Sequence, residues 1–302
     1  MSTSAALLPI EADLDAIEQV GLWKDAWTRF RRNRLAIIGG TVVLLLVLDA
    51  FLAPVLEAAH LIANPLKQDP VNLYASASWS HPMGLDALGR DLMSRLMFGA
   101  QISLTIGVLV QGIIVLIGLS IGLTAGYFGG KIDNLLMRFT DVWFAFPDLL
   151  FVLVLVSVFG ASELSIFAAI GLVNWVNLAR IVRGLTLSLR EREFVEAARA
   201  VGSSPLRIIS RHIFPNILGP VIVTITFGIP QAIFTEAVLS YLGVGIPPPT
   251  PSWGTMIHDG YEAINYAPMQ AGWPAIAIAI TMLAFTFLGD GLRDALDPRM
   301  RK

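Results

Sequence analysis

Six apolar runs, each close to the length that an α-helix needs to cross a membrane, are spaced along the chain. A bilayer core of about 30 Å requires about 20 helical residues. The last run is short for a complete crossing, and we expect it to extend to Leu292 or to tilt. The runs predict six transmembrane helices: Leu35–Leu56, Leu104–Tyr127, Val142–Phe159, Ser165–Val182, Ile217–Leu242 and Trp273–Leu288.

Lys and Arg are unevenly distributed among the segments that connect these runs. Basic residues in short loops resist transfer across a membrane, so basic segments are expected on the cytoplasmic side. The segment before the first run, the stretch between the fourth and fifth runs, and the tail are basic, whereas residues 243–272 and 160–164 contain neither Lys nor Arg. Residues 57–103 mix Lys67, Arg90 and Arg95 with four acids. The pattern predicts that both termini are cytoplasmic.

Residues 185–216, between the fourth and fifth runs, are too charged to lie in hydrocarbon. Phe194 to Val201 are mostly good helix formers, and Gly202 suits the position after a helix end, where φ is positive. Ser204 is a favourable N-cap, and Pro205 fits the first helical position. The stretch therefore predicts a helix, a stop and a second helix, in other words a preformed hairpin outside the membrane.

Overall composition supports an all-α integral membrane protein. The 302-residue chain is 55% hydrophobic and 15% charged, whereas soluble domains are about 45–50% apolar and about 25% charged. The absence of cysteine excludes disulfides and thiolate metal sites, and a formal net charge of −2 gives no reason to expect nucleic acid as a partner.

The sequence contains no arrangement of side chains that predicts catalysis. Residues 126–132 faintly resemble a phosphate-binding loop, but Ala125 and Ile132 stand where the Walker pattern requires Gly and Ser or Thr. The four histidines are far apart and lack the spacing of metal ligands. We therefore expect a protein that is not an enzyme and that binds no metal or cofactor.

Glycines and prolines occur at defined places within the runs. Gly118, Gly122 and Gly126 repeat every fourth residue and share one helix face, which favours close helix packing; a hinge or a pore lining is the alternative. Pro147 in the third run and Pro230 in the fifth predict kinks, which membrane helices tolerate where protein or water satisfies the freed backbone groups.

The charged hairpin resembles the EAA loop of ABC-importer permeases. The resemblance rests on Glu196-Ala197-Ala198, three intervening residues, Gly202, and Phe214-Pro215 at the end of the loop. Arg-His-Ile-x-Pro-Asn at residues 211–216 is the form typical of the peptide-permease branch. Further segments that resemble the oligopeptide and dipeptide permeases are 22–34, 81–96, 126–133, 241–254 and 289–298, and 181–189 is most similar to the second permease of oligopeptide systems, the C-type subunit.

This resemblance implies a type I ABC importer permease fold in the bacterial inner membrane. Residues 1–34 would form an amphipathic cytoplasmic segment, 35–103 the first transmembrane helix with a periplasmic loop, 104–292 a five-helix permease core, and 293–302 a cytoplasmic tail. The implied partners are a homologous B-type permease, two ATPase subunits or domains, an extracytoplasmic binding protein and membrane lipid. ATP and Mg²⁺ would be bound by the ATPases and not by this chain.

Two groups of residues are candidates for the transport function. The resemblance implies that Glu196 orients the hairpin on the ATPase, that Ala197 and Ala198 allow close packing, and that Gly202 forms the turn, with Arg207 and Pro215 in the same coupling loop. Polar residues at membrane depth are expected to serve function. We expect four of them to border the path of a peptide, with interhelical hydrogen bonding as the alternative: Asn174, Asn177, Gln231 and Glu236.

The cargo and the class of transporter each leave an alternative open. Close relatives of peptide permeases import dipeptides, nickel complexes or glutathione, and permease sequences discriminate among these cargoes poorly. A protein of a different class would be a stand-alone secondary transporter or channel, which is expected to contain intramembrane ion sites or an inverted repeat. Neither feature is evident in the sequence, so we favour the permease of an ATP-driven oligopeptide importer.

Overall fold

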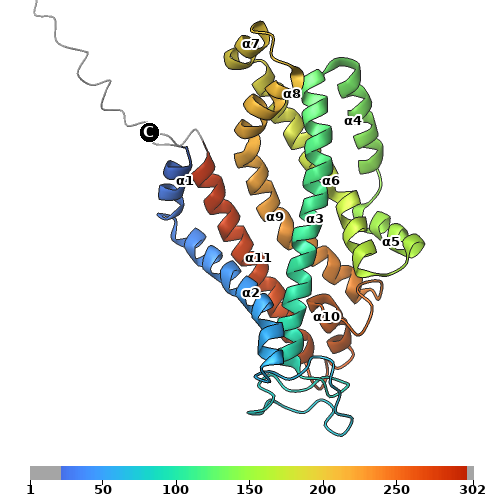
Figure 1. Ribbon diagram of the computed structural model, residues 1–302. Coiled ribbons are helices and arrows are strands. Elements are labelled where there is room, and N and C mark those ends of the chain that lie inside the picture. Colours follow the sequence, from blue (N-terminus) through green and yellow to red (C-terminus); the bar gives the residue numbers. More distant parts are fainter. Residues whose placement is uncertain (1–21, 298–302) are drawn as a thin grey trace, which may run out of the picture.

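The computed structural model describes residues 22–297, and in this range the helices are joined by loops, with no strand (Figure 1). Residues 1–21 and 298–302, which include most of the expected N-terminal segment and half of the expected tail, lie outside the described residues. The helices are α1 (Leu22–Phe30), α2 (Arg34–Ala58), α3 (Leu92–Phe128), α4 (Gly130–Phe144), α5 (Asp148–Phe159), α6 (Glu163–Arg190), α7 (Glu193–Ala200), α8 (Pro205–Ile208), α9 (Phe214–Tyr241), α10 (Trp253–Tyr261) and α11 (Met269–Leu296).

Five helices are long and apolar enough to cross a membrane: α2, α3, α6, the continuous helix made by α8 and α9, and α11. The expected third crossing is not one straight helix, because the chain breaks between Phe144 and Asp148 and α4 and α5 meet at 83°. This pair is the sixth candidate crossing. Pro147 fixes φ at −60° just before α5 and lacks the N–H that would continue α4, which explains the break.

α3 and α6 form the centre of the bundle, because they pack more extensively against each other than any other two helices. Lipid tails are as apolar as leucine, so helices in a membrane associate through close packing rather than through removal of apolar surface from water. The repeating glycines of α3 provide that packing: a Cβ at Gly122 would lie 2.6 Å from the carbonyl oxygen of Ala179 on α6. The expectation of helix packing for these glycines is therefore confirmed.

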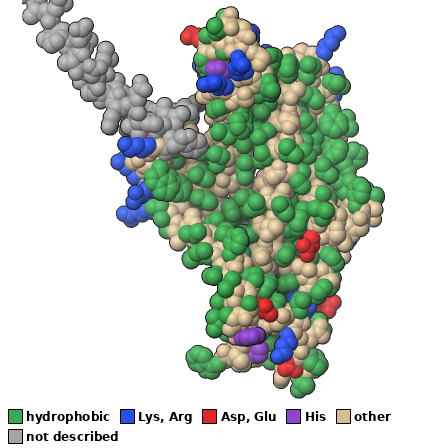
Figure 2. All heavy atoms as spheres, in the orientation of Figure 1, with side chains coloured by type: hydrophobic (Ala, Val, Ile, Leu, Met, Phe, Trp, Pro, Cys, Tyr) green, Lys and Arg blue, Asp and Glu red, His purple; other side chains and the backbone are tan. Residues whose placement is uncertain are grey.

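The two ends of the bundle differ in structure. Figure 1 places the α7–α8 hairpin at one end, and the loop of residues 59–91 together with α10 at the other. On the face shown in Figure 2, hydrophobic side chains cover the middle, while charged side chains gather toward the ends. The segments that the charge pattern assigns to opposite sides of the membrane are thus separated in space, and which end faces the cytoplasm stays a prediction.

Candidate functional site

The α7–α8 hairpin has the turn that its sequence predicts. Gly202 has φ = +79°, and its N–H donates a hydrogen bond to the carbonyl of Arg199, while the N–H of Ser203 donates to the carbonyl of Ala198. These two bonds close the end of α7 as a Schellman motif. Ser204 then precedes α8, and Pro205 is its first residue. The hairpin is therefore a defined local structure rather than a loose connection.

One side of the hairpin is buried and the other is open. Val195 and Ala198 (8% exposed) pack into the same apolar core as Ile208 and Ile213, so Ala198 does not face outward. Glu196, Ala197, Arg207 and Pro215 are exposed. Two apolar side chains on the outer surface are also strongly exposed, Val201 at 84% and Leu206 at 76%. Exposed apolar residues among charges are typical of a surface that a partner covers.

The hairpin is joined to the bundle through α9. A single π-helical turn, Ile209–Ile213, connects α8 to α9, so residues 205–241 form one continuous helix. Arg190, at the end of α6, donates hydrogen bonds to the carbonyls of Gly126 (3.4 Å) and Tyr127 (3.3 Å) on α3. A displacement of the hairpin would therefore act directly on the helices that form the centre of the bundle.

A cavity of about 270 Å³, lined by amides and threonines as well as by apolar side chains, lies between α3, α6 and α9. Three of the four residues expected along a peptide path, Asn174, Asn177 and Gln231, line it together. Thr224 and Thr235 lie on the same side of α9 as Gln231. No residue that lines this cavity is charged. The structure thus brings the three expected amides to one cavity within the apolar bundle.

Gln111, a residue that the sequence analysis did not assign to the path, belongs to this cavity. Gln111 is only 5% exposed, and its side chain forms no hydrogen bond with any residue in the range 22–297. Gly228 on α9 leaves the space that the amide occupies, since a Cβ there would lie 2.5 Å from both Nε2 and Oε1 of Gln111. Buried polar groups normally have partners, so this amide is available to a molecule in the cavity.

A second cavity of about 260 Å³ shares part of this lining. Asn174, Gln231 and Thr235 border both spaces, and Asp148, the first residue of α5, borders only the second. Asp148 is exposed and forms no ion pair within the part of the chain that the structure describes. The break before α5 therefore places a carboxylate beside the amides.

Glu236 lies apart from the other three expected path residues. It is fully buried, and its Oε1 accepts hydrogen bonds from Ser240 (2.6 Å) and from Ser252 (2.8 Å) at the N-terminus of α10. It lines neither of the two cavities. The structure thus gives Glu236 the alternative that the sequence left open, an interhelical hydrogen-bonding role.

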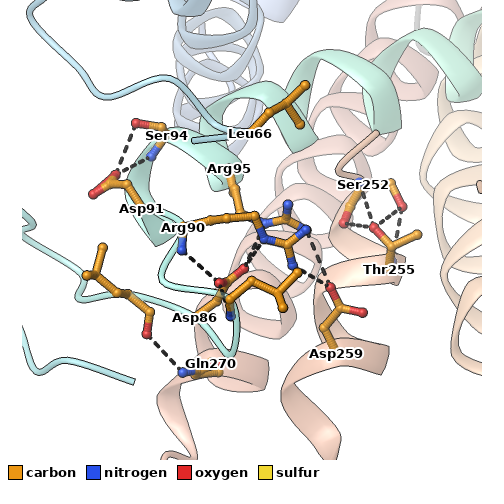
Figure 3. A network of polar contacts seen from close by, with 12 residues as sticks. Leu66, Asp86, Arg90, Asp91, Ser94, Arg95, Ser252, Thr255, Asp259 and Gln270 are labelled. Atoms are coloured by element: carbon orange, nitrogen blue, oxygen red, sulfur yellow. Dashed lines mark hydrogen bonds and ion pairs between the residues drawn. The ribbon is translucent and has the colours of Figure 1, made fainter. Parts of the chain in front are cut away.

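The end opposite the hairpin is held by a buried ionic network (Figure 3). Asp86 accepts a hydrogen bond from Arg90 Nε (2.6 Å), and Asp259 on α10 lies 3.2 Å from Arg90 and 3.4 Å from Arg95. The side-chain amide Nε2 of Gln270 on α11 donates a hydrogen bond to the carbonyl of Leu85 (3.0 Å). Arg90 and Arg95, the two arginines of residues 57–103, are therefore both paired with carboxylates. This pairing explains how a segment predicted to lie outside the cell tolerates them.

Two family models match the chain. One, described as "Binding-protein-dependent transport system inner membrane component", matches residues 118–302. The other, described as "N-terminal TM domain of oligopeptide transport permease C", matches residues 21–75. Together they cover α1, α2, the end of α3 from Gly118, and every helix from α4 to α11, including the hairpin.

Curated relatives match over nearly the whole chain. The oligopeptide transport system permease protein OppC of Bacillus subtilis is 42% identical, covering 97% of this chain and 94% of the relative. The dipeptide transport system permease protein DppC of the same organism is 40% identical (97% and 90% covered). The glutathione transport system permease protein GsiD of Pectobacterium atrosepticum is 39% identical (92% and 92% covered).

The fold also resembles a solved structure, an inward-facing conformation of the MetNI methionine ABC transporter. The match has a TM-score of 0.51 and 19% sequence identity, and it covers 68% of this chain and 98% of the solved chain. At this identity the match is evidence for the fold alone. It supports the arrangement of helices expected of a type I ABC importer permease.

Proposed function

This chain belongs to the family of binding-protein-dependent transport system inner membrane components, and from that premise we propose that it is a permease subunit of an ATP-driven importer of oligopeptides. Membership of this family removes support from the alternative of a stand-alone secondary transporter or channel. The proposal includes a bacterial inner-membrane location with both termini in the cytoplasm. It also includes a homologous second permease, two ATPase subunits and an extracytoplasmic binding protein.

One observation carries the proposal: residues 205–241 are a single helix that begins in the hairpin and ends beyond the cavity between α3, α6 and α9. A partner that moves the hairpin would move Thr224, Gln231 and Thr235 in the cavity wall with it. ATP-driven closure of the ATPases would thereby favour one of two bundle conformations, in the manner of a population shift. This chain would supply half of the path and bind no nucleotide itself, since ATP and Mg²⁺ belong to the ATPases.

The exposed surface of the hairpin is the proposed contact with the ATPase. Glu196, Ala197, Arg207 and Pro215 would contribute to it, together with the apolar side chains of Val201 and Leu206. Gly202 would set the turn. Ala198 would not contact the ATPase itself, because it packs the hairpin against the apolar core of this chain.

Reconstitution tests the proposal. The assembled complex in proteoliposomes should take up a labelled oligopeptide only with ATP and the loaded binding protein. Glu196→Lys should reduce recovery of the ATPase with the permease at least about tenfold, because reversal of a contact charge removes an attraction and adds a repulsion. The matched control is Glu163→Lys at the opposite end of α6. Uptake without any ATPase subunit would contradict the proposal.

The cargo is proposed from the relatives. The oligopeptide, dipeptide and glutathione permeases are similar to this chain to almost the same degree, at 42%, 40% and 39% identity. Dipeptides and glutathione are therefore the alternative cargoes, and nickel complexes are a further one. Competition of each compound against labelled oligopeptide uptake distinguishes them.

A further inference from the structure

The two cavities, although largely apolar, are lined by several side chains with unused hydrogen-bonding groups. Gln111, Asn177 and Gln231 form no side-chain hydrogen bond with residues of the described range, and Asn174 uses only its amide N–H group, toward the carbonyl of Ile170. An amide both donates and accepts hydrogen bonds. The lining is therefore complementary to another chain of amides, such as a peptide backbone, whatever side chains that peptide carries.

Asp148 adds one charge to this neutral surface. Of the residues that line the two cavities, it is the only one with a formal charge. It faces a space bordered by Asn174, which lies about 16 Å along α6 from its first residue and therefore well inside the bilayer. An unpaired carboxylate that borders a cavity reaching into the bilayer is costly, and ionisable residues inside a membrane mark the routes of substrates or ions.

We propose that Asp148 binds the free α-ammonium group of the peptide while the neighbouring amides bind its backbone. This inference rests on the proposed function. An ammonium group offers three donors and a full positive charge to the carboxylate. A metal ion fits less well, since Ca²⁺ requires six to eight oxygen ligands, and only one carboxylate is present. A carboxylate end of a peptide would be repelled.

The absence of cysteine makes a direct test possible. Thr235→Cys places one thiol where the two cavities meet. In the assembled complex, the thiol should react faster with a cationic methanethiosulfonate reagent than with an anionic one. Asp148→Asn should lower that rate ratio about threefold to tenfold, because one nearby charge is removed. Glu163→Gln, a carboxylate of α6 that lines neither cavity, should leave it unchanged.

Protection of the same thiol identifies the bound group. Without the binding protein, trialanine and trialanine amide should protect the thiol at concentrations about tenfold lower than N-acetyl-trialanine, which corresponds to one charge-assisted hydrogen bond. Asp148→Asn should abolish the difference, and Asp148→Glu should preserve it. The comparison of peptides needs no change at position 148, so it remains informative if that variant fails to assemble.

The outcomes separate this inference from the proposed function. The inference would be overturned if Asp148→Asn left the rate ratio unchanged. It would also be overturned if the thiol reacted with neither reagent, because the carboxylate would then not face a water-filled cavity. Equal protection by free and acetylated peptides would overturn the role of the ammonium while leaving the path in place. No protection by any peptide in a complex that still transports would place the path elsewhere.

Discussion

At the scale of single residues, Gly202 shows how the backbone conformation of one residue can define the turn of the α7–α8 hairpin. Its φ of +79° is unfavourable for residues with a side chain, yet no heavy atom lies within 4 Å of the position that a Cβ would take. Strain rather than crowding therefore limits substitution there. Left-handed backbone costs a residue other than glycine about 1–2 kcal/mol, and a β-branched residue is affected most.

Gly202→Val should therefore misalign α7 and α8 and uncouple ATP hydrolysis from uptake. Gly202→Asn is the matched control, because asparagine adopts positive φ more readily. The measurement is ATPase activity of the reconstituted complex with and without loaded binding protein. We expect stimulation to be largely lost in the valine variant and retained in the asparagine variant. Normal stimulation in the valine variant would refute the role given to the turn.

Residue types alone indicated which polar groups are unusual but not which direction each one faces. Gln231 and Glu236 are five residues apart, which places them about 140° apart around a helix. They cannot share a face, and the structure accordingly puts Gln231 in the cavity and Glu236 against α10. Gln111 was missed as a cavity-lining residue because its place there depends on Gly228 of another helix, a contact that no local pattern contains.

At the scale of elements, the transmembrane helices were predictable because apolar length is a strong signal. The kink expected at Pro147 is present, but its size was not predictable, since hydrophobicity continues across the break between α4 and α5 and only Pro147 marks it. α10 was also missed: it is short, and its signal was the pair Ser252 and Thr255, which form a capping box at its start. α3 begins earlier than expected because Asp91 caps it outside the apolar run.

The packing of α3 on α6 gives a prediction at this scale. Gly122→Ala would place a Cβ 2.6 Å from the carbonyl oxygen of Ala179 and 2.7 Å from Cβ of Val182. Such overpacking costs about 1–3 kcal/mol. We expect a lower thermal denaturation midpoint of the purified permease pair. Gly112→Ala on the same helix, where nothing lies within 4 Å of the added atom, should not lower it, and equal midpoints for the two variants would contradict this account.

At the scale of the whole molecule, the hairpin and the loop of residues 59–91 occupy opposite ends of the bundle. The proposed function requires these ends to face different compartments, because an ATPase would contact the first and cargo would arrive from the side of the second. The distribution of Lys and Arg predicts that the hairpin is inside. The buried pairing of Arg90 and Arg95 removes the apparent exception.

This orientation can be measured because the chain has no cysteine of its own. Ala200→Cys in the hairpin and Ser76→Cys in the opposite loop each introduce one exposed thiol. A membrane-impermeant reagent applied to spheroplasts should label position 76 at once and position 200 only after permeabilisation. Labelling of position 200 in sealed spheroplasts would reverse the orientation and remove the basis for the ATPase contact.

The position of α10 has a mechanical consequence. Near its N-terminus, Trp253 donates hydrogen bonds to α3 through its indole N–H, at the carbonyl of Leu96, and through its backbone N–H, at Ser103 Oγ. Ser252 connects the same end to α9, and Asp259 connects the helix to the loop of residues 59–91. Three separate parts of the chain are thus fastened at one place. We expect this end to be the pivot of the bundle, so that the amplitude of any rocking increases with distance from α10 and a small rotation there opens the far end widely.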